Sequence, residues 1–459
     1  MRSSSGKSSV DLTEGSIVKS IILFALPLLL GQIFQNLYNS VDSIVVGRAV
    51  GVTALAAVTS CADISNILIG FFTGLSVGAG VAFSRFFGAK DYDRLHRSVH
   101  TAILFSIIVG VGMVIIGIVL APFLLHMVDC PAEVYPEALT YLRIYFIGVM
   151  FTAIYNVQSG VLRAVGDSRT PLYYLIIASV TNIILDILFV VVLHMGVAGV
   201  ATATILAQGE SVLLVTIKML RTKDVYKLVP RDLKIEGPLL VDILRLGIPA
   251  AIQSCLITFS NLFVQRYVNG FGTAAMAGTG AAKKIDNYIS QLTVALAQSL
   301  TTYISQCVGA WKKQRAFKSI RYALCINFVT VAVVSVPLYI FAGDVASLFT
   351  SDAESLRYAV LMIHTLIPFY IIQSFHQMFS NSVRGFGKSM VTMITSIAGL
   401  IAMRQIFLAI AMHISHDIKL VYLGWPVGWF FSALFAFIYF MFAIYRPYRR
   451  SLSESQEIS

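Results

Sequence analysis

Two acidic residues in apolar segments are the residues of this chain best suited to chemistry. Asp42 stands near the end of an apolar run over 17–47, and Asp186 stands inside another over 171–194. A charged side chain at the centre of a membrane helix costs about 2.5–3.5 kcal/mol on insertion scales, so such residues usually have a function. A carboxyl group can take up a proton or hold a small cation. The two acids therefore indicate binding and release of H⁺ or Na⁺.

Polar neighbours accompany both acids at helical spacing. One face of the first segment carries polar residues three or four positions apart, namely Gln32, Gln35, Asn36, Asn39 and Asp42. In the second segment Asn182 precedes Asp186 by four positions, so the two share a face. An asparagine amide oxygen can join carboxylates in an oxygen shell for Na⁺. Two structural alternatives stay open, since an acid near a helix end can snorkel and an Asn–Asp pair can hydrogen-bond a neighbouring helix.

The elements that must position these residues are membrane helices. Of the 459 residues 57% are hydrophobic and 12% charged, with a mean hydropathy of +0.80, whereas soluble domains carry about 25% charged residues. The pattern predicts an all-α polytopic membrane protein. Its twelve predicted helices cover 17–47, 53–84, 98–120, 134–160, 171–194, 197–217, 241–270, 274–308, 322–343, 357–383, 390–412 and 420–445.

The distribution of basic residues predicts an orientation. Of 34 Lys and Arg residues, 25 lie in or next to loops on one side, and only Arg48, Arg357 and Lys419 lie on the other. By the positive-inside rule the basic side is cytoplasmic. The basic cytoplasmic loops therefore explain the net charge of +11. We expect the lipid bilayer as a partner and no nucleic acid. We predict a cytoplasmic tail over 1–16, an N-lobe over 17–220, a cytoplasmic linker over 221–240, a C-lobe over 241–446 and a cytoplasmic tail over 447–459.

The two halves of the sequence resemble each other at an offset of 221 positions. SRFFGAKDYDRL (84–95) aligns with SQCVGAWKKQRA (305–316), and VLRAVGDS (161–168) aligns with SVRGFGKS (382–389). Each half has an even number of helices, so the repeats are parallel, as in transporters that rock two lobes. The first helices of the two halves align at 222, as Pro27 and Pro249 show, so Val264 stands where the first half has Asp42. At 221, Met403 and Phe407 stand where it has Asn182 and Asp186.

The second half carries cations instead. Lys283, Lys284 and Arg404 lie in its apolar segments, with Asp286 three positions after Lys283. The basic groups could contact anionic parts of a substrate, or could snorkel or pair, and Asp286 fits an ion pair with Lys283 as well as a site. Asp63 and Glu210 in the first half have no obvious local partner, and whether they line a cavity is left open.

The candidate residues of the first half lie at similar depths below the outer ends of their predicted helices. With the predicted orientation, Asp42 lies about 8 Å and Asp186 about 12 Å from the outer ends of their helices, at 1.5 Å per residue. Tyr141 and Thr204 come out about 10 Å deep by the same arithmetic. The sequence therefore predicts one outer layer of polar groups within the N-lobe.

At this point the sequence resembles the multidrug and toxic compound extrusion (MATE) family, within the MOP superfamily. The resemblance rests on LPLLLGQIFQNLYNSVDSIVVGR (26–48), GVLRAVGDSRTP (160–171), TNIILD (181–186), GVAGVATATILAQ (196–208), VRGFGKS (383–389) and KID (284–286). It implies a fold of twelve helices in two parallel repeats of six. It also implies an exporter of drugs driven by H⁺ or Na⁺, most similar to the DinF-like branch.

The resemblance assigns roles to particular residues. Asp42, Asn182 and Asp186 match the coupling residues of the DinF-like branch directly, while Gln35, Asn39, Tyr141, Asn156 and Thr204 fall in its N-lobe cavity as a second tier. Acids expected in the NorM-like branch are missing, because Gln253 and QSFHQMFSNS (373–382) offer none. Lys283, Lys284, Asp286 and Arg404 are candidate substrate contacts in the C-lobe, and the cations there disfavour a purely cationic substrate.

These observations predict a monomeric antiporter in the plasma (inner) membrane that exports amphipathic small molecules. One alternative is a flippase for a lipid-linked saccharide, whose pyrophosphate Arg266, Lys283, Lys284 and Arg404 would hold. The other is an intramembrane serine hydrolase that uses Ser76 of GLSVG (74–78). Small residues at such spacing more often allow close helix packing, and the enzyme interpretation lacks a histidine on that helix, so we predict that the chain is not an enzyme.

Overall fold

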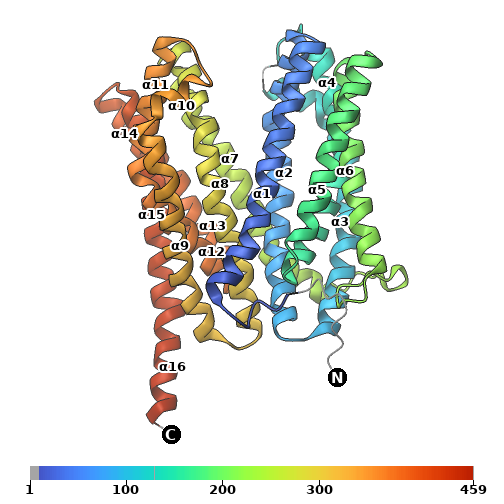
Figure 1. Cartoon of the computed structure of the whole chain (residues 1–459), viewed down its shortest axis with the longest axis vertical. Helices are drawn as coiled ribbons and strands as arrows, with labels where there is room; N and C mark the ends of the chain where they lie inside the picture. The colour runs from blue at the N-terminus through green and yellow to red at the C-terminus, as the bar shows by residue number, and fades with distance from the viewer. Residues whose placement is uncertain (1–9, 129, 458–459) are drawn as a thin grey trace. The chain divides into compact units, whose positions relative to one another are not determined.

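The structure is a computed structural model, which describes residues 10–128 and 130–457. Its described residues form long helices joined by short loops (Figure 1). The first half contains α1 (Ile17–Ala49), α2 (Val52–Gly88), α3 (Tyr92–Met127), α4 (Tyr135–Ala164), α5 (Arg169–Asp186) and α6 (Gly196–Arg221). The second half contains α7 (Gly237–Asn269), α8 (Thr273–Gly309), α9 (Lys313–Ile340), α10 (Ala342–Ser347), α11 (Ala353–Leu366), α12 (Tyr370–Gly385), α13 (Ser389–Ser396), α14 (Arg404–Ile414), α15 (Ile418–Tyr439) and α16 (Arg446–Glu457).

Several long helices contain a change of helix type. Wider π-helical turns link α5 to the loop before α6 (η1, Ile187–Val192), α13 to α14 (η4, Ile397–Met403) and α15 to α16 (η5, Phe440–Tyr445). A 3₁₀ turn (η3, Ile367–Phe369) joins α11 to α12, and another (η2, Pro230–Asp232) lies in the linker. Because π-helical turns shift the register of a helix and are frequent at functional sites, residues next to η1 and η4 are candidates for a functional site.

Eleven helical spans within the described residues are long and apolar enough to cross a membrane. They confirm the prediction of a polytopic helical membrane protein. The one predicted span that does not meet this criterion is α8, although it is 37 residues long. Its apolar residues alternate with Ser, Thr and Gln and with Lys283, Lys284 and Asp286, so its composition is that of a polar-lined helix.

The chain divides into two compact units. The N-unit holds the residues up to Gly15, Leu23–Ala251 and Gln306–Trp311, and the C-unit holds Ser16–Ile22, Ile252–Ser305 and Lys312 onward. Each unit therefore includes a short piece of the other half of the sequence.

In the N-unit, α4 lies at the centre and packs against α2, α3 and α6. Phe146 and Leu142 of α4 are fully buried in its core. The linker after α6 is fastened to α3, because Val229 N–H donates to His100 Nε2 (2.9 Å) and Arg97 pairs with Glu236 (3.0 Å). The linker is thus an ordered part of this unit.

The GLSVG stretch lies where α2 crosses α7 within the N-unit. A Cβ added to Gly74 would meet the backbone of Ala250, and one added to Gly78 would meet the backbone of Leu246. The hydroxyl of Ser76 donates to the backbone carbonyl of Asn156 and receives a bond from Arg163 (3.3 Å). The stretch therefore allows two helices to approach closely, as the packing interpretation predicts.

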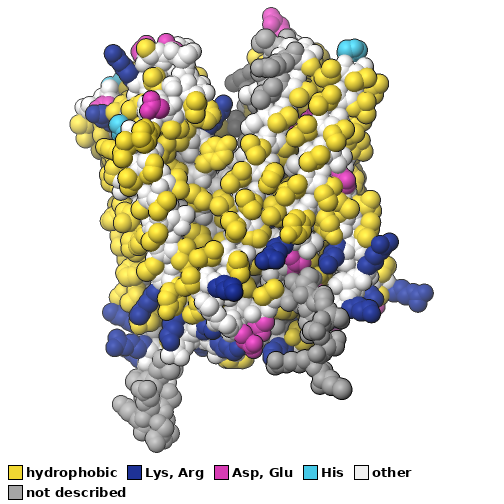
Figure 2. Space-filling view, in the orientation of Figure 1, with side chains coloured by type: hydrophobic (Ala, Val, Ile, Leu, Met, Phe, Trp, Pro, Cys, Tyr) yellow, Lys and Arg dark blue, Asp and Glu magenta, His cyan; other side chains and the backbone are white. Residues whose placement is uncertain are grey.

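In the C-unit, α15 packs against α11, α12, η4 and α14. Aromatic rings fill one end of it, where Phe317 stacks on Tyr448 (4.5 Å between ring centroids) and Phe379 contacts Phe440 (5.5 Å). On the visible face of this unit hydrophobic side chains cover the helices, and Lys and Arg gather near the end where α16 lies (Figure 2).

Candidate ion-coupling site

The N-unit brings Asp42 of α1 and Asp186 of α5 together. Their carboxyl groups lie within hydrogen-bonding reach of each other. Asp186 is fully buried and Asn182 is 1% exposed, whereas Asp42 is partly buried. Residues far apart in sequence thus meet as a buried acidic pair.

Most polar atoms around this pair lack a donor in the part of the chain that the structure describes. Asp42 Oδ1, both carboxyl oxygens of Asp186 and both amide atoms of Asn182 are buried without a hydrogen-bond partner among the described residues. An ionised carboxylate only accepts hydrogen bonds, and two of them in contact repel each other unless a proton or a cation lies between them. The arrangement of oxygens therefore fits a shared proton or a small hard cation such as Na⁺.

The helix geometry changes directly after Asp186. α5 ends at this residue, and the π-helical segment η1 begins at Ile187. In such a segment each amide bonds five residues back, so the side chains that follow are turned relative to a regular α-helix. Asp186 therefore stands at a break in register on α5.

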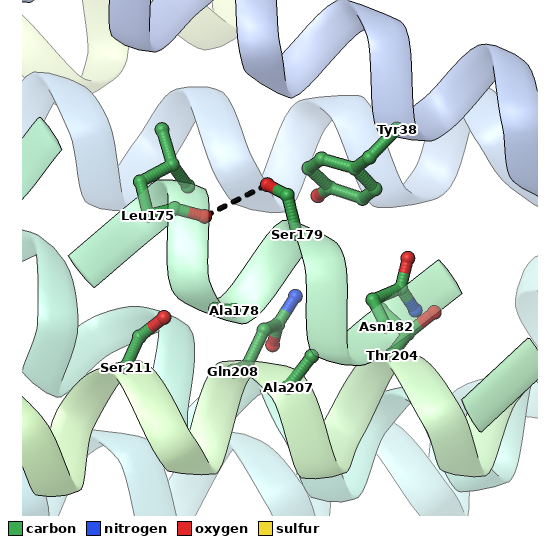
Figure 3. A pocket seen from close by; sticks show the side chains of 9 residues that line it. All are labelled: Tyr38, Leu175, Ala178, Ser179, Asn182, Thr204, Ala207, Gln208 and Ser211. Atoms are coloured by element: carbon green, nitrogen blue, oxygen red, sulfur yellow. Dashed lines mark hydrogen bonds between the residues drawn. The ribbon is translucent and has the colours of Figure 1, made fainter. Parts of the chain in front are cut away.

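A small cavity adjoins Asn182 inside the N-unit (Figure 3). It has a volume of about 40 Å³ and is lined by Tyr38, Leu175, Ala178, Ser179, Asn182, Thr204, Ala207, Gln208 and Ser211. Pockets for drug-sized ligands measure about 300–1,000 Å³, whereas a water needs roughly 10–15 Å³. This cavity therefore suits water or an ion and excludes a drug.

Other predicted residues of the N-lobe lie at different distances from the acids. Thr204 lines the cavity, and its hydroxyl donates to the Val200 carbonyl (3.0 Å), which leaves the oxygen able to accept. Tyr141 lies within electrostatic range of Asp42 and stacks on Tyr145 (6.0 Å between centroids). Gln35 hydrogen-bonds Tyr38, which also interacts electrostatically with Asp42.

Asn156 belongs to a separate polar network. Its Nδ2 donates to the Thr152 carbonyl (2.9 Å), and its Oδ1 accepts from Thr73 (3.4 Å). Thr152 in turn donates to Gln208 of the cavity (2.8 Å). The structure therefore links Asn156 to the cavity through Thr152 and does not place it among the hydrogen-bond partners of the acids.

Three further acidic or polar candidates of the N-lobe are Asn39, Asp63 and Glu210. The side chains of Asn39 and Asp63 lie outside the described residues. Glu210 of α6 is partly buried and has one carboxyl oxygen without a partner.

Sequence reasoning missed Tyr38 and Gln208. Each lies one helical turn from a residue that it did select, since Tyr38 precedes Asp42 by four positions and Gln208 follows Thr204 by four. Helical spacing was thus a signal that could have found them.

The C-unit places its charged residues on polar partners. Arg404 donates from Nη1 to Asn261 Oδ1 (3.0 Å) and from Nη2 to Ser260 Oγ (2.6 Å). Lys283 donates to Gln265 Oε1 (2.6 Å) and lies over the ring of Trp425 (5.6 Å to its centroid).

Asp286 and Lys284 have other surroundings. Asp286 accepts a short hydrogen bond from the Tyr370 hydroxyl (2.5 Å). It interacts electrostatically with Lys283, but no salt bridge joins the two among the described residues. Lys284 is exposed and lies 5.9 Å from the centre of the Phe349 ring. The ring beside Lys284 thus differs from the groups that hold Lys283 and Arg404.

Comparison with known proteins decides the family. The MatE family model matches residues 27–188 and 249–410. The chain belongs to the MatE family. It is therefore a membrane transporter of the MOP superfamily and not an enzyme, so the serine hydrolase interpretation is wrong. The two matched blocks also confirm the internal repeat, because one lies in each half of the sequence.

Individual relatives cover nearly the whole MatE chain. It is 30% identical to the "Probable multidrug resistance protein YoeA" of Bacillus subtilis, over 94% of this chain and 95% of that protein. A solved MOP superfamily transporter from Pyrococcus furiosus, described as having a binding pocket of reverse polarity, has a TM-score of 0.89 and 25% identity, over 95% of this chain and 98% of its own. A solved outward-facing multidrug resistance MATE transporter has a TM-score of 0.88 and 26% identity, over 95% of this chain and 98% of its own.

Proposed function

We propose that this MATE transporter is a secondary antiporter that exports drugs or other amphipathic small molecules in exchange for H⁺ or Na⁺. The observation that carries the proposal is the pair of carboxyl groups of Asp42 and Asp186 in the N-unit, of which Asp42 Oδ1 and both oxygens of Asp186 are buried without a hydrogen-bond partner among the described residues. The multidrug names of its relatives support the exported class.

The chain's own residues explain how an ion could bias its conformation. When Asp42 and Asp186 are both ionised, their repulsion separates α1 from the end of α5. When a proton or Na⁺ is held between them, with the Asn182 amide oxygen as a further ligand for Na⁺, the repulsion is removed. Pro27 lies inside α1, where a proline removes a backbone hydrogen bond, so α1 can bend below Asp42 in response.

We assign the chain to the DinF-like branch, as a monomer in the plasma (inner) membrane with both termini and the linker on the cytoplasmic side. In support, the acids lie in the N-unit, and Gln253 of the C-unit bonds Arg384 (2.7 Å) and Ser396 (2.8 Å) where the other branch would need an acid. The lobe boundaries 17–220 and 241–446 belong to the same proposal.

The flippase alternative has less support. It needs Arg266, Lys283, Lys284 and Arg404 around one pyrophosphate. Lys284 is exposed beside Phe349, whereas Arg404 is buried between α14 and α7, so these two cations have different surroundings.

Transport by purified protein in liposomes tests the proposal. Accumulation of tetramethylrhodamine, a dye with both a cationic ring system and a carboxylate, is measured with a proton gradient and a sodium gradient imposed separately. We expect one gradient to drive accumulation and an ionophore that collapses it to stop the process. Equal accumulation in protein-free liposomes, or transport that neither gradient accelerates, would overturn antiport. Movement of a fluorescent lipid-linked saccharide without any gradient would favour the flippase.

A further inference from the structure

Arg404 is a buried cation that only neutral groups surround. Its side chain is 3% exposed, and its hydrogen bonds go to the Ser260 hydroxyl and the Asn261 amide oxygen. No carboxyl group of the described residues pairs with it. Its Nε is buried without a partner. A buried charge is normally paired, so this guanidinium lacks the counter-charge that its position requires.

Lys283 brings a second cation to the same face of α7. Arg404 is held by Asn261 and Lys283 by Gln265, and these two residues are four positions apart on α7. They therefore lie on adjacent turns, about 6 Å apart along the helix axis. Asn261 is exposed, so this polar face of α7 reaches the surface beside the buried Arg404. Trp425 lies under Lys283 and adds an aromatic surface.

Arg404 lies beside the repeat counterparts of the proposed coupling residues. Met403, the residue before it, is the repeat counterpart of Asn182, and Phe407 is that of Asp186. In the N-unit α5 meets α1 through two acids. In the C-unit α14 meets α7, which is the repeat counterpart of α1, through Arg404. A π-helical segment lies beside the charged residue in both cases, η1 after Asp186 and η4 before Arg404.

We propose that Arg404 and Lys283 form an anion site in the C-unit that binds the carboxylate, or a similar oxyanion, of the exported molecule. A guanidinium presents planar donors that suit a carboxylate, and Nε is the donor still available. Trp425 provides a surface for the apolar body of the ligand. The substrates are therefore zwitterionic or anionic amphipathic molecules, and pure cations bind less tightly. The identity of this ligand as cargo rests on the proposed export function, but its binding does not.

A structural role for Arg404 explains less. Tying α14 to α7 would need only the two bonds to Ser260 and Asn261. A neutral amide could make them without burying a charge, and Gln405 beside it already reaches the Ser260 hydroxyl (3.3 Å). The retained charge and the unpaired Nε are accounted for by an anionic ligand.

Two dyes that differ only at a carboxylate test the site. Tetramethylrhodamine carries a free benzoate, and tetramethylrhodamine methyl ester lacks that charge. Their binding to purified full-length protein is measured by fluorescence anisotropy without an ion gradient, in gluconate buffer. We expect the wild type to bind the free acid about tenfold more tightly or better, as for a charge-assisted hydrogen bond. We expect Arg404→Met to lose this preference while its affinity for the ester stays the same.

Further variants separate a lost ligand from lost folding. Lys283→Met removes the less buried cation and should reduce the preference by a smaller factor. Arg357→Met removes an exposed cation of α11 and should leave it unchanged. Size-exclusion profiles check the fold of each variant. If Arg404→Met does not fold, the preference of Lys283→Met for the free acid over the ester decides the test.

Several results would overturn the inference. They are failure of the wild type to bind the free acid, equal binding of the acid and the ester, or a preference that survives both Arg404→Met and Lys283→Met. Loss of the preference when chloride replaces gluconate would assign the site to small inorganic anions instead. The binding assay uses no gradient, so a negative binding result does not contradict ion-driven export. Equally, a failure to detect export does not contradict a positive binding result.

Discussion

The N-unit and the C-unit use corresponding helix pairs for groups of opposite charge. In the N-unit, α1 and α5 meet through Asp42 and Asp186. In the C-unit, α7 and α14 meet through Arg404 on neutral partners. The duplicated scaffold thus conserves the place where a polar site forms, and single side chains decide which ion it attracts. On the proposals made above, the coupling ion and the anionic group of the substrate do not compete for one site.

The largest effect is expected from neutralising the acidic pair. Asp42→Asn and Asp186→Asn should each reduce ion-driven export to the level of protein-free liposomes, because an amide neither binds a proton at neutral pH nor supplies a negative charge. The assay is gradient-driven transport of tetramethylrhodamine. Glu354→Gln, which changes an exposed acid of α11, is the matched control. Wild-type rates in either variant would remove the functional distinction between the units.

A smaller effect is expected at Asn182, which offers an oxygen but no charge. With Asn182→Leu, sodium-driven export should need about tenfold more sodium, which corresponds to about 1.4 kcal/mol of binding free energy. Proton-driven export should change by less than about threefold, because a proton shared between two carboxyl groups needs no third ligand. The comparison uses the same liposomes with each gradient in turn. An unchanged sodium requirement would exclude Asn182 from the coupling site.

The two units also differ in how tightly corresponding helices cross. Gly78 of α2 faces the Leu246 backbone in the N-unit, and its repeat counterpart Ser299 of α8 donates to the Ile21 carbonyl (3.0 Å) in the C-unit. Gly78→Ala should lower the free energy of unfolding by about 1–3 kcal/mol through overpacking. Ser299→Ala should cost about 1 kcal/mol for one lost hydrogen bond. Thermal unfolding in detergent ranks them, and a larger loss for Ser299→Ala would contradict the packing difference.

The smallest effect is expected from the acid of the C-unit. Asp286 accepts a bond from Tyr370, and an amide oxygen can accept the same bond. Asp286→Asn should therefore keep ion-driven export within about threefold of wild type, since the bond from Tyr370 is retained and only its strength changes. Abolished coupling in this variant would show that both units bind the ion and would end the contrast between them.

The sequence by itself determined the helical membrane fold, the repeat and the choice of acids. Apolar runs of membrane length reveal the spans because lipid leaves backbone groups no other partner than the helix. Polar residues at helical spacing singled out Asp42, Asn182 and Asp186, because a charge in such a run is costly. One span is less clear from composition. The Ser, Thr and Gln residues of α8 lower its hydropathy, so it is not among the eleven helices apolar enough to cross a membrane.

Only the tertiary structure decided which of these residues meet. The pairing of Asp42 with Asp186 depends on how α1 is rotated against α5, and the cavity depends on α6, neither of which spacing along one helix can give. Asn156 shows the same limit, because the family resemblance implied a cavity role while its hydrogen bonds lead to Thr73 and Thr152. Asp286 and Lys283 are correctly spaced for an ion pair, yet Tyr370 and Gln265 take their hydrogen bonds. Periodicity fixes the face of a helix, and packing between helices decides what that face contacts.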